Sequence, residues 1–249
     1  MIQAMSAGVD GIDFAPIPPG VRIHSNAGSF AGPVAEHAWG LVLGAAKGLH
    51  VRNAKVVPRR LRGGTLLVLG CGAIGSEVAS LSRSLDMEVT GISRSFARPE
   101  LFAKRLQLSS LKEALQIADG VVITLPLTAT TRGLITYELL KTTKDSVVVV
   151  NVGRGEVVSE PGLVRWLSER PESRYATDVF WKRGGRESFE TGAWALPNFS
   201  GTRHVSGVPL GETLEVPMVA AAQNVRRYLE TGSADHLVDR SEYFTPKSE

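Results

Sequence analysis

The stretch LLVLGCGAIGSEVASL, Leu66 to Leu81, decides the fold. An apolar run leads into three glycines and then into a helical pattern, and the glycines fit G-x-G-x-x-G. Gly70 permits a tight turn, Gly72 lets a phosphate approach the backbone, and Gly75 lets the helix pack closely on the strand. Amides at the start of such a helix attract phosphate groups. The pattern predicts a dinucleotide-binding loop, with a purely structural glycine turn as the alternative.

Short apolar strands alternate with helical segments along the rest of the chain. Strand-like runs occur at residues 65–70, 87–95, 120–126, 146–153, 174–180 and 198–204. Helical patterns occur at residues 32–49, 73–85, 109–119, 136–142, 159–170 and 211–232. This alternation is typical of right-handed βαβ units and of a parallel sheet covered on both faces. We predict an α/β fold with a doubly wound, Rossmann-type parallel sheet.

Composition narrows the class of protein. The 249 residues are 43% hydrophobic and 21% charged, and a net charge of +3 is too small to predict nucleic-acid binding. The basic segment 50–64 is interpreted as a solvated connection. The single cysteine, Cys71, excludes an internal disulfide and suits a reducing compartment. Because no membrane-length apolar run or signal-peptide pattern occurs, we predict a cytoplasmic protein without membrane contact, and we predict no metal site.

The residues after the second strand favour one dinucleotide. An acidic residue there would bind the ribose 2′-hydroxyl of NAD, but the chain has Ser93, Arg94 and Ser95, followed by Arg98. A hydroxyl and two guanidiniums suit a 2′-phosphate, because arginine offers paired donors to phosphate oxygens. We therefore predict NADP as the preferred cofactor and NAD as the alternative. A solvent-facing polar turn is the other interpretation of these residues.

Two further candidates follow predicted strands. Arg154 stands between Gly153 and Gly155 in VVNVGRGEVV, and His204 lies in SGTRHVSG. The carboxyl ends of parallel strands meet at one edge, where doubly wound sheets bind their ligands. A lone arginine or histidine is more often structural, but two such residues at the edge of the glycine loop are joint candidates for catalysis.

A series of motifs in fixed order resembles the D-isomer-specific 2-hydroxyacid dehydrogenase family, which includes glyoxylate, hydroxypyruvate and phosphoglycerate dehydrogenases. The motifs are SAGVDGID, VAEHAWGL, LGCGAIG, ITLPLTATTRGLI, VNVGRGEVV, ATDVF and HVSG. The resemblance implies an NAD(P)-dependent oxidoreductase that interconverts a small 2-oxo acid and its D-2-hydroxy acid by hydride transfer. It also implies a homodimer paired through the helix at residues 32–49.

The resemblance further implies roles for individual residues. Ala7, Gly8 and Val9 would offer backbone amides to the substrate carboxylate. Arg154 would bind that carboxylate and polarise the 2-oxo group, and His204 would exchange a proton with the substrate oxygen. The residues implied to lie along the cofactor are Gly70, Gly72, Ala73, Ile74, Gly75, Ser93, Arg94, Ser95, Pro126, Thr131, Val152, Gly153, Asp178 and Gly207.

Two positions depart from the family's pattern. Arg183 stands five residues after the aspartate of ATDVF, where the family has a glutamate that keeps the histidine cationic, and Arg203 replaces the proline usual before the histidine. A guanidinium beside His204 would lower the pKa of its imidazole. We therefore expect weakened activity unless Glu187 or Glu190 supplies the missing carboxylate. The alternative function is a catalytically impaired NADP-binding protein, either a redox sensor or a partner subunit.

The domain organisation follows from the same resemblance. The chain begins inside the family's substrate domain, so we expect truncation at the N-terminus. Residues 1–28 are predicted to be a remnant of a flavodoxin-like substrate domain, and residues 29–208 the NAD(P)-binding Rossmann domain. Residues 209–249 are predicted to form a helix that returns to the substrate domain, followed by a tail. An incomplete substrate domain would weaken closure of the cleft.

Overall fold

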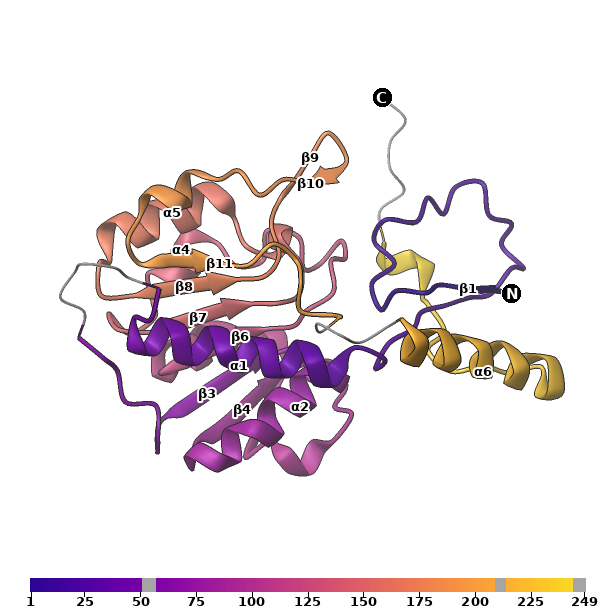
Figure 1. The fold of residues 1–249 in the computed structure, drawn as a ribbon, viewed down its shortest axis with the longest axis horizontal. Helices are drawn as coiled ribbons and strands as arrows, with labels where there is room; N and C mark the ends of the chain where they lie inside the picture. Colours follow the sequence, from indigo (N-terminus) through magenta and orange to yellow (C-terminus); the bar gives the residue numbers. More distant parts are fainter. Residues whose placement is uncertain (51–56, 209–213, 244–249) are drawn as a thin grey trace.

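A seven-stranded parallel sheet forms the centre of the structure, a computed structural model that describes residues 1–50, 57–208 and 214–243 (Figure 1). The strand order is β11-β8-β7-β6-β3-β4-β5. The strands are β3 (Thr65–Leu69), β4 (Glu88–Ile92), β5 (Lys104–Leu106), β6 (Gly120–Ile123), β7 (Val148–Asn151), β8 (Arg174–Thr177) and β11 (Phe199–Gly201). The predicted doubly wound α/β fold is confirmed. Strand β5 was not predicted, because its exposed Lys104 and Arg105 interrupt any apolar run.

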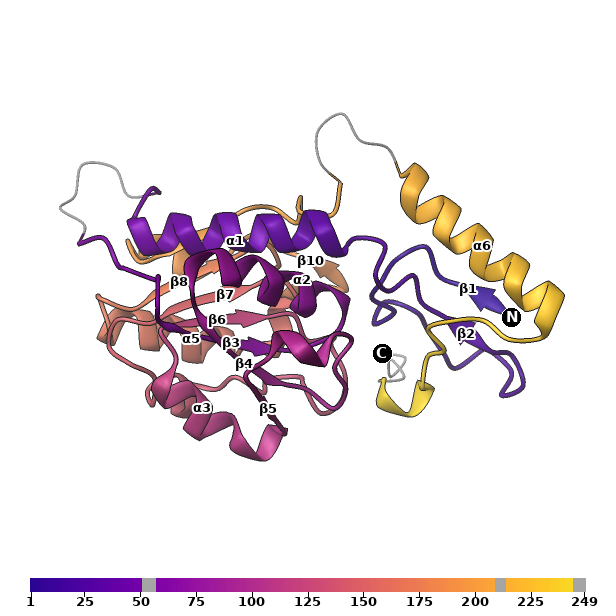
Figure 2. The same cartoon turned by 90° about the horizontal axis from the view of Figure 1, so that it is seen from below.

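Helices cover both faces of the sheet (Figure 2). They are α1 (Ala31–Lys47) and α2 (Ala73–Ser82) on one face, and α3 (Leu111–Ile117), α4 (Tyr137–Leu140) and α5 (Glu160–Glu169) on the other. Strand β3 shows how the sequence serves both layers. Leu66 and Val68 pack with α1 and α2, whereas Leu67 and Leu69 pack with α3 and α5. Successive side chains of a strand point to opposite faces of the sheet. Because helices cover both faces, every side chain of a continuous apolar strand is buried.

The sheet has a topological switch point between β3 and β6. From β3 the chain adds β4 and β5 toward one edge, and then returns to add β6, β7, β8 and β11 toward the other edge. The loops that leave β3 and β6 therefore diverge at their carboxyl ends. Doubly wound sheets bind ligands in this crevice. The glycine loop at residues 70–75 leaves β3 there.

A smaller unit lies beside the sheet and contains both ends of the described chain (Figures 1 and 2). Strand β1 (Ile2–Gln3) pairs in parallel with β2 (Ile23–His24), over a small core of Val9, Phe14 and Ile23. Helix α6 (Glu215–Thr231) contacts β1. The chain then returns to β2, where the Val238 amide donates to the Ile23 carbonyl at 2.8 Å.

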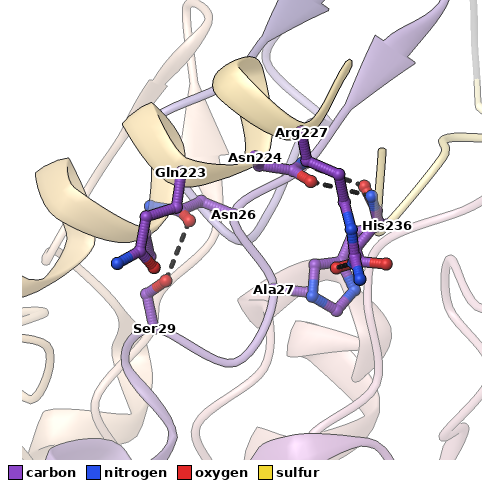
Figure 3. A pocket seen from close by; sticks show the side chains of 9 residues that line it. Asn26, Ala27, Ser29, Gln223, Asn224, Arg227 and His236 are labelled. Atoms are coloured by element: carbon purple, nitrogen blue, oxygen red, sulfur yellow. Dashed lines mark hydrogen bonds and ion pairs between the residues drawn. The ribbon is translucent and has the colours of Figure 1, made fainter. Parts of the chain in front are cut away.

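Polar side chains join the smaller unit to the start of α1 (Figure 3). They surround a cavity of about 320 Å³ between residues 26–29 and α6. Asn26 Nδ2 donates to the Pro217 carbonyl at 2.8 Å, and Ser29 Oγ donates to Asn26 Oδ1 at 2.8 Å. On the far side of the cavity Asn224 and Asp235 bond to each other. This network fixes the connection that enters α1 against the helix of the smaller unit.

A two-strand hairpin of β9 (Lys182–Arg183) and β10 (Arg186–Glu187) projects from the sheet side toward the smaller unit (Figure 1). The short 3-10 helices are η1 (Arg83–Leu85), η2 (Pro99–Leu101), η3 (Leu108–Ser110), η4 (Gly155–Val157), η5 (Gly192–Ala195) and η6 (Arg240–Glu242). None of the helices in the described residues is long and apolar enough to cross a membrane. Residues 51–56 of the predicted basic connection and 211–213 of the predicted last helix lie outside those residues.

Candidate active site

The glycine loop has the geometry that its sequence predicts. Gly70 has a positive φ of 96°, and its amide donates to the Ile92 carbonyl at 2.9 Å. A Cβ at Gly75 would collide with the Gly70 carbonyl, whereas a Cβ at Gly72 would have no atom within 4 Å. The loop is therefore closed where helix and strand pack and open where a ligand would approach. Helix α2 begins at Ala73, within this glycine motif, and the first amides of a helix have no intrahelical partner.

A cavity of about 320 Å³ lies over this loop at the switch point. Its walls combine the glycines, apolar side chains and a polar end formed by the residues after β4. The predicted cofactor residues that line it are Gly70, Gly72, Ala73, Ile74, Gly75, Ser93, Arg94, Ser95, Pro126 and Thr131. An apolar cleft with a few polar groups and an open glycine cradle fits a dinucleotide.

A second cavity of about 430 Å³ adjoins the first, since Ala7 and Ile74 line both. It brings together residues from distant parts of the chain: Ser6, Ala7, Gly8, Phe30, Val34, Ile74, Val152, Arg154, His204, Val205, Ser206, Gly207 and Val208. Both predicted catalytic residues, Arg154 and His204, therefore face one space together with Gly8 of the smaller unit.

Three predicted site residues do not line these cavities. Val9 is 1% exposed and packs in the core of the smaller unit. The Gly153 amide donates to Asn151 Oδ1 at 3.0 Å, which shapes the turn before Arg154. Asp178 is fully buried. These three residues lie outside the cavity walls and support the segments that carry the site.

Asp178 builds the turn that carries His204. Its Oδ1 accepts hydrogen bonds from the Val205 amide at 3.0 Å and the Thr202 hydroxyl at 2.5 Å, and its Oδ2 accepts from the Ser206 amide at 3.0 Å. The Asp178 carbonyl also accepts from the His204 amide at 2.8 Å. Burial alone would raise the pKa of Asp178, but these bonds outweigh burial and lower it. The ionised carboxylate holds His204 in its left-handed conformation, at φ 53°.

Glu187 is the carboxylate partner of His204. Its Oε2 lies 2.6 Å from His204 Nδ1, and its Oε1 accepts a hydrogen bond from the Phe180 amide at 2.6 Å. The bond to Glu187 raises the pKa of His204 above its ordinary value, against the opposing effect of burial. Burial would raise the pKa of Glu187, but the bond to His204 and the Phe180 amide lower it. The pair therefore favours a carboxylate beside an imidazolium.

The expectation that Arg183 would lie beside His204 and lower its pKa is wrong. Arg183 Nη2 lies 2.8 Å and 3.0 Å from the two carboxylate oxygens of Glu160. The reason is the hairpin, which turns at two glycines with φ of 56° and 76°. Because Glu187 is paired with Lys182 and Arg186 with Arg183, the two arginines lie on the opposite face from Glu187. The sequence KRGGRE carried this hairpin signal.

Arg154 is held between the two units by a carboxylate that sequence reasoning missed. Arg154 Nε donates to Asp10 Oδ1 at 2.9 Å, and Lys182 Nζ donates to Asp10 Oδ2 at 2.7 Å. Burial would raise the pKa of Asp10, but the two cations outweigh burial and lower it. Gly8 lies against the guanidinium, and a Cβ there would collide with Arg154 Nη2. Asp10 stands in the motif SAGVDGID, so its motif was recognised but its role was not.

Both arginines expected at a 2′-phosphate have acidic partners. Arg94 Nη2 donates to Glu242 Oε2 at 2.8 Å, and Arg94 Nη1 bonds to the other oxygen of the same carboxylate. Arg98 Nη2 lies 3.1 Å from Glu77 Oε1. Glu242 is 148 positions from Arg94, so no local pattern could have found this pair.

In the described parts of the chain, no group of three or more His, Cys, Asp or Glu residues could hold a metal ion.

Comparisons with known proteins identify the family of this chain. Residues 33–206 match the model of the family "D-isomer specific 2-hydroxyacid dehydrogenase, NAD binding domain". Glyoxylate reductase of Aeropyrum pernix is 32% identical over 200 residues, which cover 72% of this chain and 59% of that protein. The chain spans about half the length of other curated relatives, such as the D-3-phosphoglycerate dehydrogenases of Archaeoglobus fulgidus, at 44%, and Methanocaldococcus jannaschii, at 47%.

Two solved structures have a similar fold. A protein from Pyrobaculum aerophilum, provisionally described as a formate dehydrogenase, is 33% identical with a TM-score of 0.84, covering 98% of this chain and 83% of that one. A D-isomer specific 2-hydroxyacid dehydrogenase from Xanthobacter autotrophicus Py2, solved with NADPH and MES, is 26% identical with a TM-score of 0.79, covering 95% and 76%. Because the family model matches well over half of the chain, this chain belongs to the D-isomer specific 2-hydroxyacid dehydrogenase family.

Proposed function

We propose that this chain interconverts a small 2-oxo acid and its D-2-hydroxy acid with a nicotinamide dinucleotide. One observation carries the proposal: Arg154 and the His204–Glu187 pair face a single cavity that adjoins the cavity over the glycine loop. A cation for the carboxylate and a positioned acid for the carbonyl oxygen are the two groups that reduction of a 2-oxo acid requires. The bound nicotinamide would supply or accept the hydride.

Arg154 and the loop at Ala7 and Gly8 form the carboxylate-binding side of the site. The guanidinium has a planar set of donors that matches a carboxylate, and the backbone of the loop offers amides beside it. Asp10 orients Arg154 through its Nε and leaves Nη2 against Gly8. The carboxylate class of substrate follows from these donors, and glyoxylate, hydroxypyruvate and pyruvate are the acids to test.

His204 moves the proton. Its Nδ1 is engaged by Glu187, so Nε2 is the ring nitrogen left for the substrate oxygen. In reduction, the imidazolium donates this proton to the carbonyl oxygen, and in oxidation the neutral ring accepts it from the hydroxyl. Glu187 favours the protonated ring at the start of reduction. Arg183, the residue that favoured an impaired binding protein, is bonded to Glu160 instead, so that argument for the alternative function no longer applies.

The residues present would hold a dinucleotide at two ends. The glycine loop and the start of α2 face the position of the diphosphate, and Ser93, Arg94 and Ser95 line the polar end of the cavity. We include NADP as the preferred cofactor in this proposal, because arginine and hydroxyl groups favour a 2′-phosphate over a hydroxyl. The Xanthobacter relative, solved with NADPH, supports this preference.

The proposal assigns the two units different tasks. Residues 29–208 would hold the dinucleotide, and residues 1–28 with the C-terminal helix would supply the substrate-binding side. We also propose a homodimer in the cytoplasm. Helix α1 supports the dimer, because Gly32, Glu36, Gly40 and Leu43 form an exposed stripe that lets another helix approach closely.

The test is NADPH oxidation by the purified chain with glyoxylate, hydroxypyruvate and pyruvate, with His204→Ala and Arg154→Gln in parallel. We expect turnover that falls about 100-fold or more in His204→Ala. Arg154→Gln should raise the KM for the acid while NADPH binding stays intact. Folded protein that binds NADPH but reduces none of these acids would contradict the proposal.

A further inference from the structure

The ion pair between Arg94 and Glu242 joins the polar end of the dinucleotide cavity to the C-terminal segment. Arg94 follows β4 and lines the cavity, and Glu242 belongs to η6. Both carboxylate oxygens of Glu242 bond to the guanidinium, one of them at 2.8 Å from Nη2. This bidentate arrangement is the one that Arg94 would offer to two phosphate oxygens.

The backbone that presents Glu242 is held independently of Arg94. Arg240 Nη1 donates to the Ile17 carbonyl at 2.9 Å, and the ring centroids of Tyr243 and Phe14 lie 5.6 Å apart. The Glu242 carbonyl also accepts a hydrogen bond from the Ala129 amide at 2.9 Å, in the loop after β6. The carboxylate therefore stays near Arg94 even when the ion pair opens.

We propose that Glu242 is a specificity-determining residue that competes with the 2′-phosphate of the dinucleotide for Arg94. The inference rests on the proposed function, because it requires the cavity to take NAD(P). A carboxylate and a phosphate repel each other, and they would need the same donors of one guanidinium. The 2′-hydroxyl of NAD carries no charge and does not require the donors of the Arg94 guanidinium. Glu242 thus weakens NADP binding and leaves NAD binding nearly unchanged.

The exposure of the pair sets the size of this effect. The Arg94 side chain is 74% exposed, and exposed ion pairs contribute little free energy. The 2′-phosphate can therefore displace Glu242, and the expected penalty is a factor of about three to five in affinity. Arg98 provides an internal comparison. It was also expected at the 2′-phosphate, but unlike Arg94 it does not line the dinucleotide cavity. Glu77 holds it from within α2, and Arg98 also donates to the Ser76 carbonyl at 3.1 Å.

The experiment measures the Kd of NADPH and of NADH by nucleotide fluorescence at fixed ionic strength, for wild type, Glu242→Gln and Glu77→Gln. We expect Glu242→Gln to bind NADPH about three- to fivefold more tightly, with the Kd of NADH changed less than about twofold. Glu77→Gln should leave the ratio of the two Kd values unchanged. Glutamine keeps the shape of the side chain, and circular dichroism checks the fold of each variant.

The outcomes separate this inference from the proposed function. An unchanged NADPH-to-NADH ratio in Glu242→Gln overturns the competition, as does an equal shift for both nucleotides. The same ratio shift in Glu77→Gln overturns the assignment to Arg94 and Glu242. Reduction of the oxo acids at saturating NADH tests the catalytic proposal independently of Glu242. If turnover fails but the ratio shifts, the competition stands and the catalytic proposal falls.

Discussion

Lys182 and Glu187 stand opposite each other across the β9–β10 hairpin, and each one reaches a different side of the active site. Lys182 Nζ lies 2.7 Å from Asp10 Oδ2, in the smaller unit, and Glu187 Oε2 lies 2.6 Å from His204 Nδ1. Cross-strand neighbours share one face of a hairpin. This six-residue hairpin therefore supplies both the carboxylate partner of His204 and an ion pair to the loop that faces Arg154.

The role of Glu187 predicts a shift in the pH profile of reduction. The pKa of His204 is raised by Glu187, so kcat/KM for reduction should be constant at low pH and fall as pH rises through that pKa. In Glu187→Gln the fall should move to lower pH, and the rate at pH 8 should drop about tenfold. A pH–rate series checks this. Glu190→Gln, in the same loop, is the control, and an unmoved profile in Glu187→Gln would argue against the pairing.

The contact between Gly8 and Arg154 predicts a substrate defect from a single methyl group. Gly8→Ala would push the guanidinium away, since the new Cβ collides with Nη2. We expect kcat/KM for the oxo acid to fall about tenfold or more, with the Kd of NADPH unchanged. Steady-state kinetics and nucleotide titration separate the two. Gly11→Ala, whose Cβ would meet no atom within 4 Å, should have no effect; equal losses in both variants would contradict this account.

The carboxylate of Asp10, whose side chain is 9% exposed, predicts a pH-dependent contribution to stability. Its pKa is lowered in the folded state, so the contribution is present above the ordinary pKa of about 3.9 and is lost as pH falls through the folded value. Asp10→Asn should lower the free energy of unfolding by about 1–3 kcal/mol at pH 7, and the difference should shrink below pH 4. Urea titrations at several pH values measure it, with Asp13→Asn as the exposed control. A constant difference at all pH values would refute the charge-based explanation.

The single cysteine should be unreactive in the folded protein. Cys71 is buried beside Gly91, and burial raises the pKa of its thiol to about 12. The thiolate is the nucleophile, so little is present at pH 8. Mass spectrometry after iodoacetamide treatment should show no alkylation of native protein and complete alkylation in urea. Rapid modification of the native chain would show that the β3–α2 region opens.

The exposed stripe on α1 predicts dimerisation. Light scattering should give twice the mass of the chain, and Gly40→Trp should reduce it to the monomer, because a Trp side chain separates two helices that pack through small residues. Gly20→Trp, in the smaller unit and also open around its Cβ, is the control. A monomeric wild-type chain would exclude this assembly.

The sequence determined the Rossmann-type sheet because its signals are local. The apolar run before Gly70, the spacing of the glycines and the strand before Arg154 depend only on neighbouring residues and on backbone conformation. The same signals placed Arg154 and His204 at one edge of the sheet. Strand β5 was not predicted, because an edge strand with charged side chains has no such pattern.

Only the tertiary structure decided which charges meet. The choice of Glu187 over Arg183 beside His204 depended on the register of a hairpin, in which a shift by one residue reverses the face of every side chain. The pairs of Asp10 with Arg154 and of Arg94 with Glu242 join residues more than a hundred positions apart. Their distances depend on how the two units pack, and that packing is encoded in the whole chain, whereas local spacing encodes only the strands, the turns and the glycine loop.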